Sequence, residues 1–310
     1  MNDKSTLTAF FKLVRYQNLL MIILMQVLIK YGLFNSFKIS ITLSDLGFLM
    51  LCLSTVCIAA AGNVINDIND VETDKINKPS HNLIGDVITL KSANTLYLIL
   101  SILGVGIGFY LSNLIGKPGF SAIFIVISAL LYLYATYLKQ ILIAGNVVIS
   151  VLVAFSILII GLYDLLPVIT PENQQTQSTI FSVLLDYALF AFLLNWLREM
   201  VKDQEDIRGD YNAGRNTLPI AIGASRTNVV IFAIGLLPLT AVIFYLYEYL
   251  FESLYAVLYT LLFIVAPLLY FLINIWTAKT VKDYKTLSLL LKLIMLMGII
   301  TLGLYQFILL

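Results

Sequence analysis

Two acidic clusters at the ends of apolar segments are the residues of this sequence best suited to chemistry. The first lies in the segment NDINDVETD, which directly follows an apolar run, and the second lies far downstream. Carboxylates at membrane depth are costly unless a cation or another charge compensates them. Two such clusters facing each other could hold hydrated magnesium and, through it, a diphosphate. They consist of Asp67, Asp70 and Asp74, and of Glu199, Asp203, Asp206 and Asp210.

Each cluster has the spacing of one helical face. Asn63, Asp67, Asp70 and Asp74 follow one another at intervals of four, three and four residues. The second cluster repeats these intervals, and residues three and four apart are neighbours on a helix. Like charges stacked in this way repel each other. The spacing therefore predicts two negatively charged stripes that meet across one pocket and share a cation.

The ligand types of the two stripes indicate a hard cation. All candidate ligands are oxygens of Asp, Glu and Asn, including Asn66 beside the first stripe. This set excludes a typical zinc or copper site and favours magnesium, manganese or calcium. We expect a solvated or structural role for His81, the single histidine, which lies in a loop.

Basic residues beside both clusters complete a candidate anion site. A departing diphosphate needs its charge matched, and Lys, Arg and magnesium can supply the positive charge. Arg198 and Lys202 share the segment of the second cluster, although Lys202 could simply neutralise its acidic neighbours. The other candidates are Lys75, Lys78, Lys139, Arg208 and Arg215.

The composition predicts an all-α membrane protein. Hydrophobic residues make up 60% of the 310 residues and the mean hydropathy is +0.94, whereas about half of the residues of soluble domains are apolar. A membrane-spanning helix needs roughly 20 apolar residues. Nine stretches meet this need, so we expect one integral-membrane domain over residues 1–310, with nine membrane-spanning helices. The stretches are 16–34, 44–65, 93–115, 119–138, 141–163, 178–200, 226–248, 254–276 and 286–308.

The distribution of basic residues predicts the orientation. If the N-terminus is cytoplasmic, all but three of the 19 Lys and Arg residues fall on the cytoplasmic side, the exceptions being Lys30, Lys38 and Lys117. Cytoplasmic loops carry such an excess of Lys and Arg. We therefore expect an N-in, C-out topology, with both acidic clusters on the cytoplasmic side. Cys52 and Cys57 lie within the second span and are expected to be small packing residues.

The motifs resemble those of the UbiA superfamily of intramembrane prenyltransferases. NDINDVETD fits its NDxxDxxxD signature, and KDQEDIRGDYNAGRNTLP fits its second DxxxD region. Arg15-Tyr-Gln-Asn18 is similar to its Arg-x-x-Asn entry to the first span. Nine spans with motifs after the second and the sixth also match, so the resemblance covers essentially the whole chain.

The resemblance implies a helical bundle around a central cavity, and with it a site and a reaction. In that family the two motifs bind magnesium and the diphosphate of an isoprenyl donor, while the prenyl tail lies in an apolar tunnel. The implied catalytic residues are Asp67, Asp70, Asp203 and Asp206. The implied metal ligands are Asn66, Asp67, Asp70, Asp74, Asp203, Asp206 and Asp210. Diphosphate contacts are expected from Lys139, Arg215, Lys78 and Arg198, and other substrate contacts from Arg15, Asn18 and Asn63.

The acceptor is predicted from the second motif. The stretch from Arg198 to Asp210 is similar to the form seen in digeranylgeranylglyceryl phosphate synthases and their bacterial relatives, although Arg208 replaces the more usual acid. We therefore expect transfer of a geranylgeranyl-type chain to the hydroxyl of a prenylglyceryl phosphate. An aromatic acceptor of quinone biosynthesis, of the 4-hydroxybenzoate or dihydroxynaphthoate type, is the alternative.

A function from another class is also open. A cation-coupled transporter could place acids at membrane depth, but it would more readily hold them near the midplane in broken helices. The expected partners are a prenyl diphosphate, a lipophilic acceptor and membrane lipid, with no nucleic acid. The expected location is a bacterial or archaeal plasma membrane. The oligomeric state, the prenyl chain length and the organism are left open.

Overall fold

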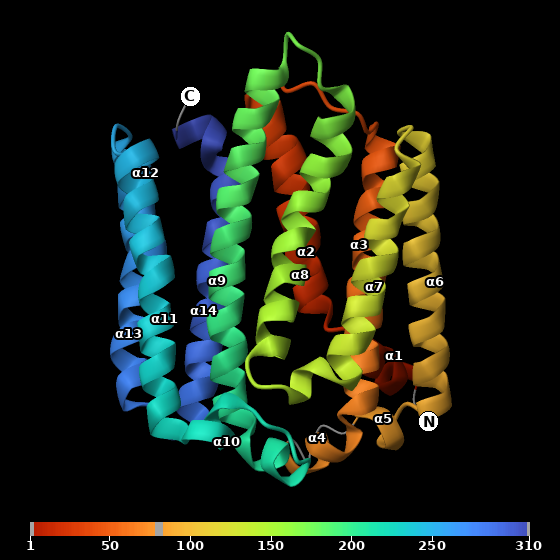
Figure 1. The fold of residues 1–310 in the computed structure, drawn as a ribbon, viewed down its shortest axis with the longest axis vertical. Helices are drawn as coiled ribbons and strands as arrows, with labels where there is room; N and C mark the ends of the chain where they lie inside the picture. The colour runs from red at the N-terminus through yellow and green to blue at the C-terminus, as the bar shows by residue number, and fades with distance from the viewer. Residues whose placement is uncertain (1–2, 78–82, 309–310) are drawn as a thin grey trace.

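A bundle of long helices forms the protein (Figure 1). The computed structural model describes residues 3–77 and 83–308. Over these residues nine helical segments are long and apolar enough to cross a membrane. They are Tyr16–Phe34, Asp45–Asn69 (α3), Leu90–Leu114 (α6), Pro118–Thr136, Ala144–Val168, Gln174–Asn212 (α9), Ala224–Leu250, Leu254–Thr277 and Val281–Tyr305.

Several spans contain more than one helical type. The first joins α2 (Tyr16–Val27) to the π-helix η1 (Leu28–Phe34), and the fifth joins α8 (Ala144–Ile160) to the π-helix η4 (Gly161–Leu165). The fourth is mainly α7 (Ser121–Thr136), and the seventh is mainly α11 (Ala224–Tyr245). The eighth contains α12 (Leu254–Thr260) and α13 (Ala266–Thr277), and the ninth belongs to α14 (Val281–Ile308).

The predicted all-α fold with nine spans is confirmed. The part of the chain that the structure describes contains no strand, only one isolated bridge. The largest difference concerns the sixth span, predicted as 178–200, because α9 continues as helix to Asn212. Its extension is rich in Glu, Lys, Gln, Asp and Arg, which either form helices well or, like Asp, are tolerated in them. The termini lie at opposite ends of the bundle, as an odd number of crossings requires (Figure 1).

Short helices gather at one end of the bundle, beside the acidic segments. They are α1 (Asp3–Leu13), α4 (Val71–Asn77), α5 (Leu83–Asp86) and α10 (Leu218–Ile222) (Figure 1). We call this end the site end. The α8–α9 connection lies at the other end of the bundle.

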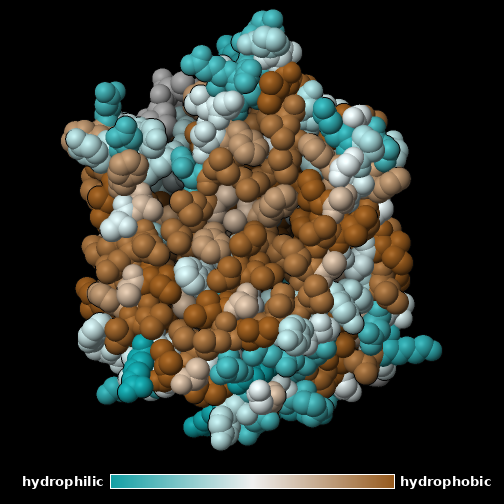
Figure 2. Space-filling view, in the orientation of Figure 1, coloured by the Kyte–Doolittle hydropathy of each residue, from teal (hydrophilic) through white to brown (hydrophobic). Residues whose placement is uncertain are grey.

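An apolar belt surrounds the molecule. Large apolar side chains remain exposed on the outward helix faces, for example Leu98, Ile102 and Phe109 on α6. Figure 2 shows this belt between two polar ends. Exposed apolar surface of this extent is unfavourable in water but suits the hydrocarbon core of a bilayer, which is about 30 Å thick. The protein is therefore an integral, multi-pass membrane protein.

A buried ion pair closes the end of the bundle opposite the site. Lys30 of η1 and Asp164 of η4 are 2% and 0% exposed, and their charged atoms are 4.0 Å apart. The Lys30 ammonium donates to the carbonyl of Leu43 at 2.7 Å, and Asp164 accepts from the Leu43 amide at 2.8 Å. The pair therefore ties the loop between the first two spans to the fifth span.

Candidate active site

The two acidic segments meet at one cavity. It has a volume of about 710 Å³ and is bordered by α2, α3, α4, α7, α8 and α9. Most of the site residues predicted from the sequence line it: Arg15, Asn18, Asn63, Asn66, Asp67, Asp70, Asp74, Lys139, Arg198, Asp203, Asp206, Asp210 and Arg215. Two of the predicted basic residues do not: Arg208 is exposed, and Lys75 is exposed and pairs with Glu72 at 2.6 Å. Lys78, the remaining predicted diphosphate contact, lies outside the described residues.

The first motif differs from the predicted continuous helical face. α3 ends at Asn69, and Asp70 leaves helical geometry with φ −97° and ψ 2° before α4 begins at Val71. The amide of Asp74 still donates to the Asp70 carbonyl at 2.7 Å. The chain therefore bends at Asp70 but keeps the helical hydrogen bond between Asp74 and Asp70. Asp74 still lines the cavity.

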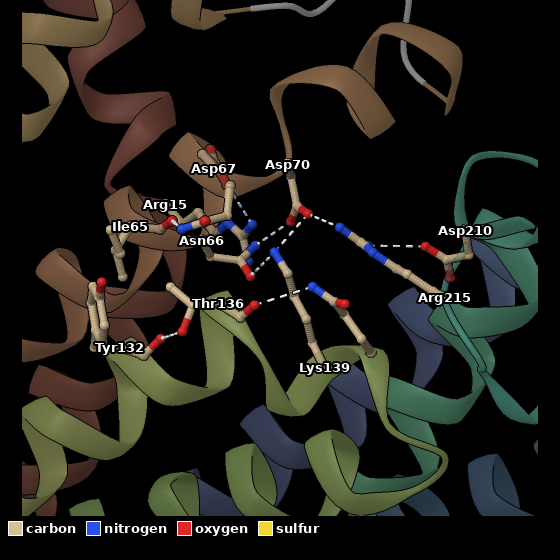
Figure 3. A network of polar contacts seen from close by, with 12 residues as sticks. Arg15, Ile65, Asn66, Asp67, Asp70, Tyr132, Thr136, Lys139, Asp210 and Arg215 are labelled. Carbon is tan, nitrogen blue, oxygen red and sulfur yellow. Dashed lines mark hydrogen bonds and ion pairs between the residues drawn. The ribbon is translucent and has the colours of Figure 1, made fainter. Parts of the chain in front are cut away.

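Asp70 is the centre of a network that joins both motifs (Figure 3). Its carboxylate accepts from the Lys139 ammonium at 2.7 Å, from the Asn66 amide at 2.8 Å and from the Arg215 guanidinium. Arg215 also donates to Asp210 of the second motif at 3.0 Å. One arginine therefore bridges the two acidic motifs, which supports their predicted convergence on one pocket.

The charges of this network hold Asp70 ionised. Burial alone would raise its pKa, but Lys139 and Arg215 outweigh burial and lower it below the usual value. Burial acts to lower the pKa of Arg215, but Asp70 and Asp210 outweigh it and raise that pKa. The carboxylate and the guanidinium are therefore both charged at neutral pH.

Two glycines position the basic side chains. Gly214 has φ 69°, a left-handed conformation that glycine adopts without strain, and the turn brings the Arg215 amide back to the Asp210 carbonyl at 2.9 Å. A Cβ on Gly145 would lie 2.7 Å from the Cα of Lys139, so only glycine lets α8 start this close to Lys139. The backbone amide of Asn216 donates to the backbone carbonyl of Gln140 at 3.2 Å, which links the loop that carries Arg215 to the loop that carries Lys139.

Arg15 reaches the site from the junction of α1 and α2. Its backbone is left-handed (φ 54°), and its guanidinium binds Asp67 at 2.8 Å. Asn63 holds the same junction, because its amide donates to the Val14 carbonyl at 2.9 Å. A left-handed non-glycine residue costs about 1–3 kcal/mol and persists where its surroundings fix it, often at functional sites.

The second motif lies on the continuous helix α9. Glu199 binds Arg198 at 3.2 Å and Lys202 at 3.3 Å. Asp203, one turn further, accepts from the Asn146 amide at 2.7 Å. Asp206 follows on the same stripe and also lines the cavity.

Two lining residues were missed by the sequence prediction. Asn146 is a polar residue five positions after the start of the span predicted as 141–163, near the site end, and this placement could have indicated it. Tyr134 lines the cavity from α7. It is one of 18 tyrosines, and no spacing distinguishes it from the others.

The donor set of the cavity fits a divalent ion that prefers oxygen. Among the described residues, no three acidic, His or Cys side chains lie close enough together to form a complete metal cage. Magnesium does not need such a cage, since it is usually bound through one or two carboxylates, several waters and phosphate oxygens. The carboxylates of both motifs line the cavity together with Asn66, so the residues fit magnesium.

Comparisons with known proteins agree with this arrangement. A model of the UbiA prenyltransferase family matches residues 19–300. Digeranylgeranylglyceryl phosphate synthase of Korarchaeum cryptofilum is 32% identical over 232 residues, which are 74% of this chain and 73% of that protein.

Two solved structures share the fold over almost their whole length. One, described as giving insight into digeranylgeranylglyceryl phosphate synthase in membranes, is 24% identical with a TM-score of 0.62, covering 96% of this chain and 99% of the other. The other is a UbiA homolog from Archaeoglobus fulgidus bound to DMAPP and Mg2+, 13% identical with a TM-score of 0.59, covering 95% and 98%. The resemblance indicated by the sequence motifs is thus confirmed, and the chain belongs to the UbiA prenyltransferase family.

Proposed function

We propose that this protein is a magnesium-dependent prenyltransferase that moves an isoprenyl chain from a prenyl diphosphate to the hydroxyl of a prenylglyceryl phosphate. The observation that carries the proposal is the convergence of both acidic motifs on one cavity, joined by Arg215 between Asp70 and Asp210. The acceptor is supported by the similarity to digeranylgeranylglyceryl phosphate synthase. The metal is supported by the fold shared with a homolog bound to DMAPP and Mg2+.

The proposed roles follow the geometry of the cavity. Lys139 and Arg215 bind the diphosphate, whereas Arg198 lines the same cavity at a distance from them along α9. Arg15, Asn18 and Asn63, which also line the cavity, contact the substrates. Asp67, Asp70, Asp203 and Asp206 are the catalytic carboxylates. The proposed metal ligands are Asn66, Asp67, Asp70, Asp74, Asp203, Asp206 and Asp210.

The reaction needs charge neutralisation and the exclusion of water. When the allylic C–O bond breaks, the electron pair leaves with the diphosphate, the acceptor oxygen forms the new ether bond and its proton is released. Magnesium supplies positive charge to the leaving diphosphate when it is bound. Lys139 and Arg215 add two fixed positive charges at the same place. Apolar lining residues such as Ile22, Leu131 and Leu152 keep water from the reactive carbon.

An assay with a panel of acceptors tests this function. Purified protein is incubated with magnesium and radiolabelled geranylgeranyl diphosphate, with geranylgeranylglyceryl phosphate, 4-hydroxybenzoate or dihydroxynaphthoate as acceptor. The expected result is one ether product, identified by mass, with the glyceryl phosphate. A product formed only with an aromatic acid would replace the acceptor, and ion flux without diphosphate release would support a transporter instead.

Removal of the divalent ion is expected to stop turnover. EDTA should lower the rate to background, because the leaving diphosphate then lacks its main neutralising charge. Magnesium added in excess should restore the rate, as measured by the release of diphosphate. An unchanged rate in EDTA would argue for a metal-free mechanism.

We further propose an N-in, C-out orientation in which the whole chain acts as one domain with its site at the cytoplasmic face. The excess of Lys and Arg at the site end supports it. Single cysteines placed at Asp86 and Gln175, in a background without Cys52 and Cys57, should react with a membrane-impermeant maleimide from opposite sides. In intact cells only the Gln175 cysteine should be labelled, and the reverse pattern would overturn the orientation.

A further inference from the structure

We propose that Lys292 and Arg198 bind the phosphate monoester of the lipid acceptor, at a place separate from the cations that hold the diphosphate of the donor. This inference rests on the proposed prenyl transfer, because it assigns the second substrate of that reaction. It concerns a smaller cavity beside the main one, between α2, α8, α9 and α14.

Lys292 is a basic residue inside a membrane-spanning helix without a counter-ion. It lies about 16 Å along α14 from Val281, at 1.5 Å per residue. Across the part of the chain that the structure describes, no carboxylate lies within ion-pair distance of it, and the charged residue that influences it is Arg198, a second cation. Ionisable groups at this depth are costly and mark functional sites. The position therefore calls for an anion from outside the chain.

Arg198 has hydrogen-bonding capacity to spare. Its guanidinium contacts Glu199 at 3.2 Å, but Glu199 also accepts from Lys202 at 3.3 Å. The Nε atom of Arg198 is buried without a hydrogen-bond partner. A buried donor of this kind is unfavourable unless a ligand accepts from it. Arg198 and Lys292 thus offer two cations and at least one free donor, which matches a phosphate monoester with a charge between −1.5 and −2.

The smaller cavity combines charged and apolar walls, as a site for the head-group end of an amphiphile requires. It has a volume of about 160 Å³, and Arg198 and Lys292 both line it. Its other walls are mostly apolar and suit an isoprenyl chain. They include Met21, Met25, Leu194, Met295, Ile299 and Leu302.

The smaller cavity is continuous with the main one. The two share lining residues from three helices: Asn18, Ile22, Val153, Ser156, Asn195 and Arg198. A head group at Lys292 therefore lies beside the reaction chamber, while its tail lies among apolar side chains.

The position of this pair separates it from the donor site. Lys139 and Arg215 surround Asp70 at the site end, whereas Arg198 lies about 18 Å from Asp210 along α9, at 1.5 Å per residue. The acidic stripe of α9, with Asp203 and Asp206, lies between them. The hydroxyl of an acceptor held at Lys292 would thus approach the donor carbon from the side opposite the diphosphate cations.

Replacement of Lys292 by methionine tests the assignment, because methionine is an unbranched side chain only one heavy atom shorter and lacks the charge and the donors of the ammonium. The apparent KM for geranylgeranylglyceryl phosphate should rise about ten- to a hundredfold, as expected for the loss of a charged hydrogen bond. The KM for geranylgeranyl diphosphate should stay within about twofold. Lys282→Met, an exposed position on the same helix, is the matched control and should change neither value.

Geranylgeranylglycerol, which lacks the phosphate, identifies the group that is bound. Wild-type protein should bind it about ten- to a hundredfold more weakly than the phosphorylated acceptor. Lys292→Met should show a much smaller preference, because only Arg198 remains to bind the phosphate. Lys292→Arg should restore the preference. A Lys292→Met protein that keeps the wild-type preference would overturn the proposal.

Nanodiscs of two compositions separate the acceptor from a membrane headgroup. If Lys292 instead holds an anionic headgroup, Lys292→Met should abolish an effect of phosphatidylglycerol on melting temperature and leave the acceptor KM unchanged, which would overturn the acceptor assignment.

Binding of the acceptor in the absence of donor separates this acceptor site from the proposed prenyl transfer. Binding that depends on Lys292 without any transfer would leave this site standing and refute the proposed reaction. Prenyl transfer by Lys292→Met with a wild-type KM for the acceptor would support the proposed reaction and overturn the acceptor site at Lys292.

Discussion

Asp70→Asn is expected to lower the rate of prenyl transfer by at least about a hundredfold. The loss of one preorganised charged group in an active site typically costs about 10²–10³ in rate. Asp70 accepts from Lys139, Asn66 and Arg215, so its charge orders the cations of the diphosphate site as well as offering a metal ligand. The measurement is kcat for diphosphate release with saturating donor and magnesium.

Glu72→Gln is the matched control for this variant. Glu72 lies two residues away, is 84% exposed and pairs with Lys75 on the surface, so the same change of acid to amide should leave kcat unchanged. Arg215 keeps Asp210 and Lys139 keeps Asn66 in Asp70→Asn, so the fold should persist, as a melting curve would show. Wild-type turnover by a folded Asp70→Asn protein would remove Asp70 from the site.

Lys30→Met is expected to lower the free energy of unfolding by about 3–5 kcal/mol without affecting catalysis by the folded protein. Breaking a buried ion pair from one side leaves the other charge uncompensated, and this is the usual size of the effect. Asp164 is 0% exposed and would keep only the amide of Leu43 as a partner for its side chain. Thermal unfolding in detergent, read by circular dichroism, measures the change.

The double variant Lys30→Met/Asp164→Leu separates the loss of the pair from the loss of one partner. Replacing both charges by apolar groups is often nearly neutral, so it should recover most of the stability. Lys117→Met, at an exposed position of the same end of the bundle, should melt like the wild type. A single Lys30→Met variant that melts like the wild type would show that water or lipid compensates Asp164.

The nine spans and the common cavity of the two acidic motifs were predictable from the sequence because both depend on local patterns. Apolar runs of membrane length appear in the order of residues, and the four-three-four spacing of the acids predicted a common cavity that the described motif residues do line. Neither the kink at Asp70 nor the partners of its carboxylate were predictable in this way, since Lys139 and Arg215 come from distant loops.

The partners of individual charges were also beyond the sequence. Lys30 was recognised only as one of three basic residues on the outer side, yet it is buried with Asp164 across the chain. Lys292 was counted with the cytoplasmic basic residues, and only the packing of α14 beside Arg198 reveals a lysine without a counter-ion. Such pairings are tertiary properties, which residue order alone does not determine.

The bridge formed by Arg215 has a consequence for how substrate enters. The two cations that contact Asp70 each already have an anionic neighbour, so neither Lys139 nor Arg215 is an unpaired charge in the pocket. A diphosphate that arrives with its divalent ion can exchange partners with these groups, so that guanidinium and ammonium pass to phosphate oxygens while the carboxylates turn to the metal. The exchange therefore leaves neither Lys139 nor Arg215 as an unpaired charge, which would be costly at membrane depth.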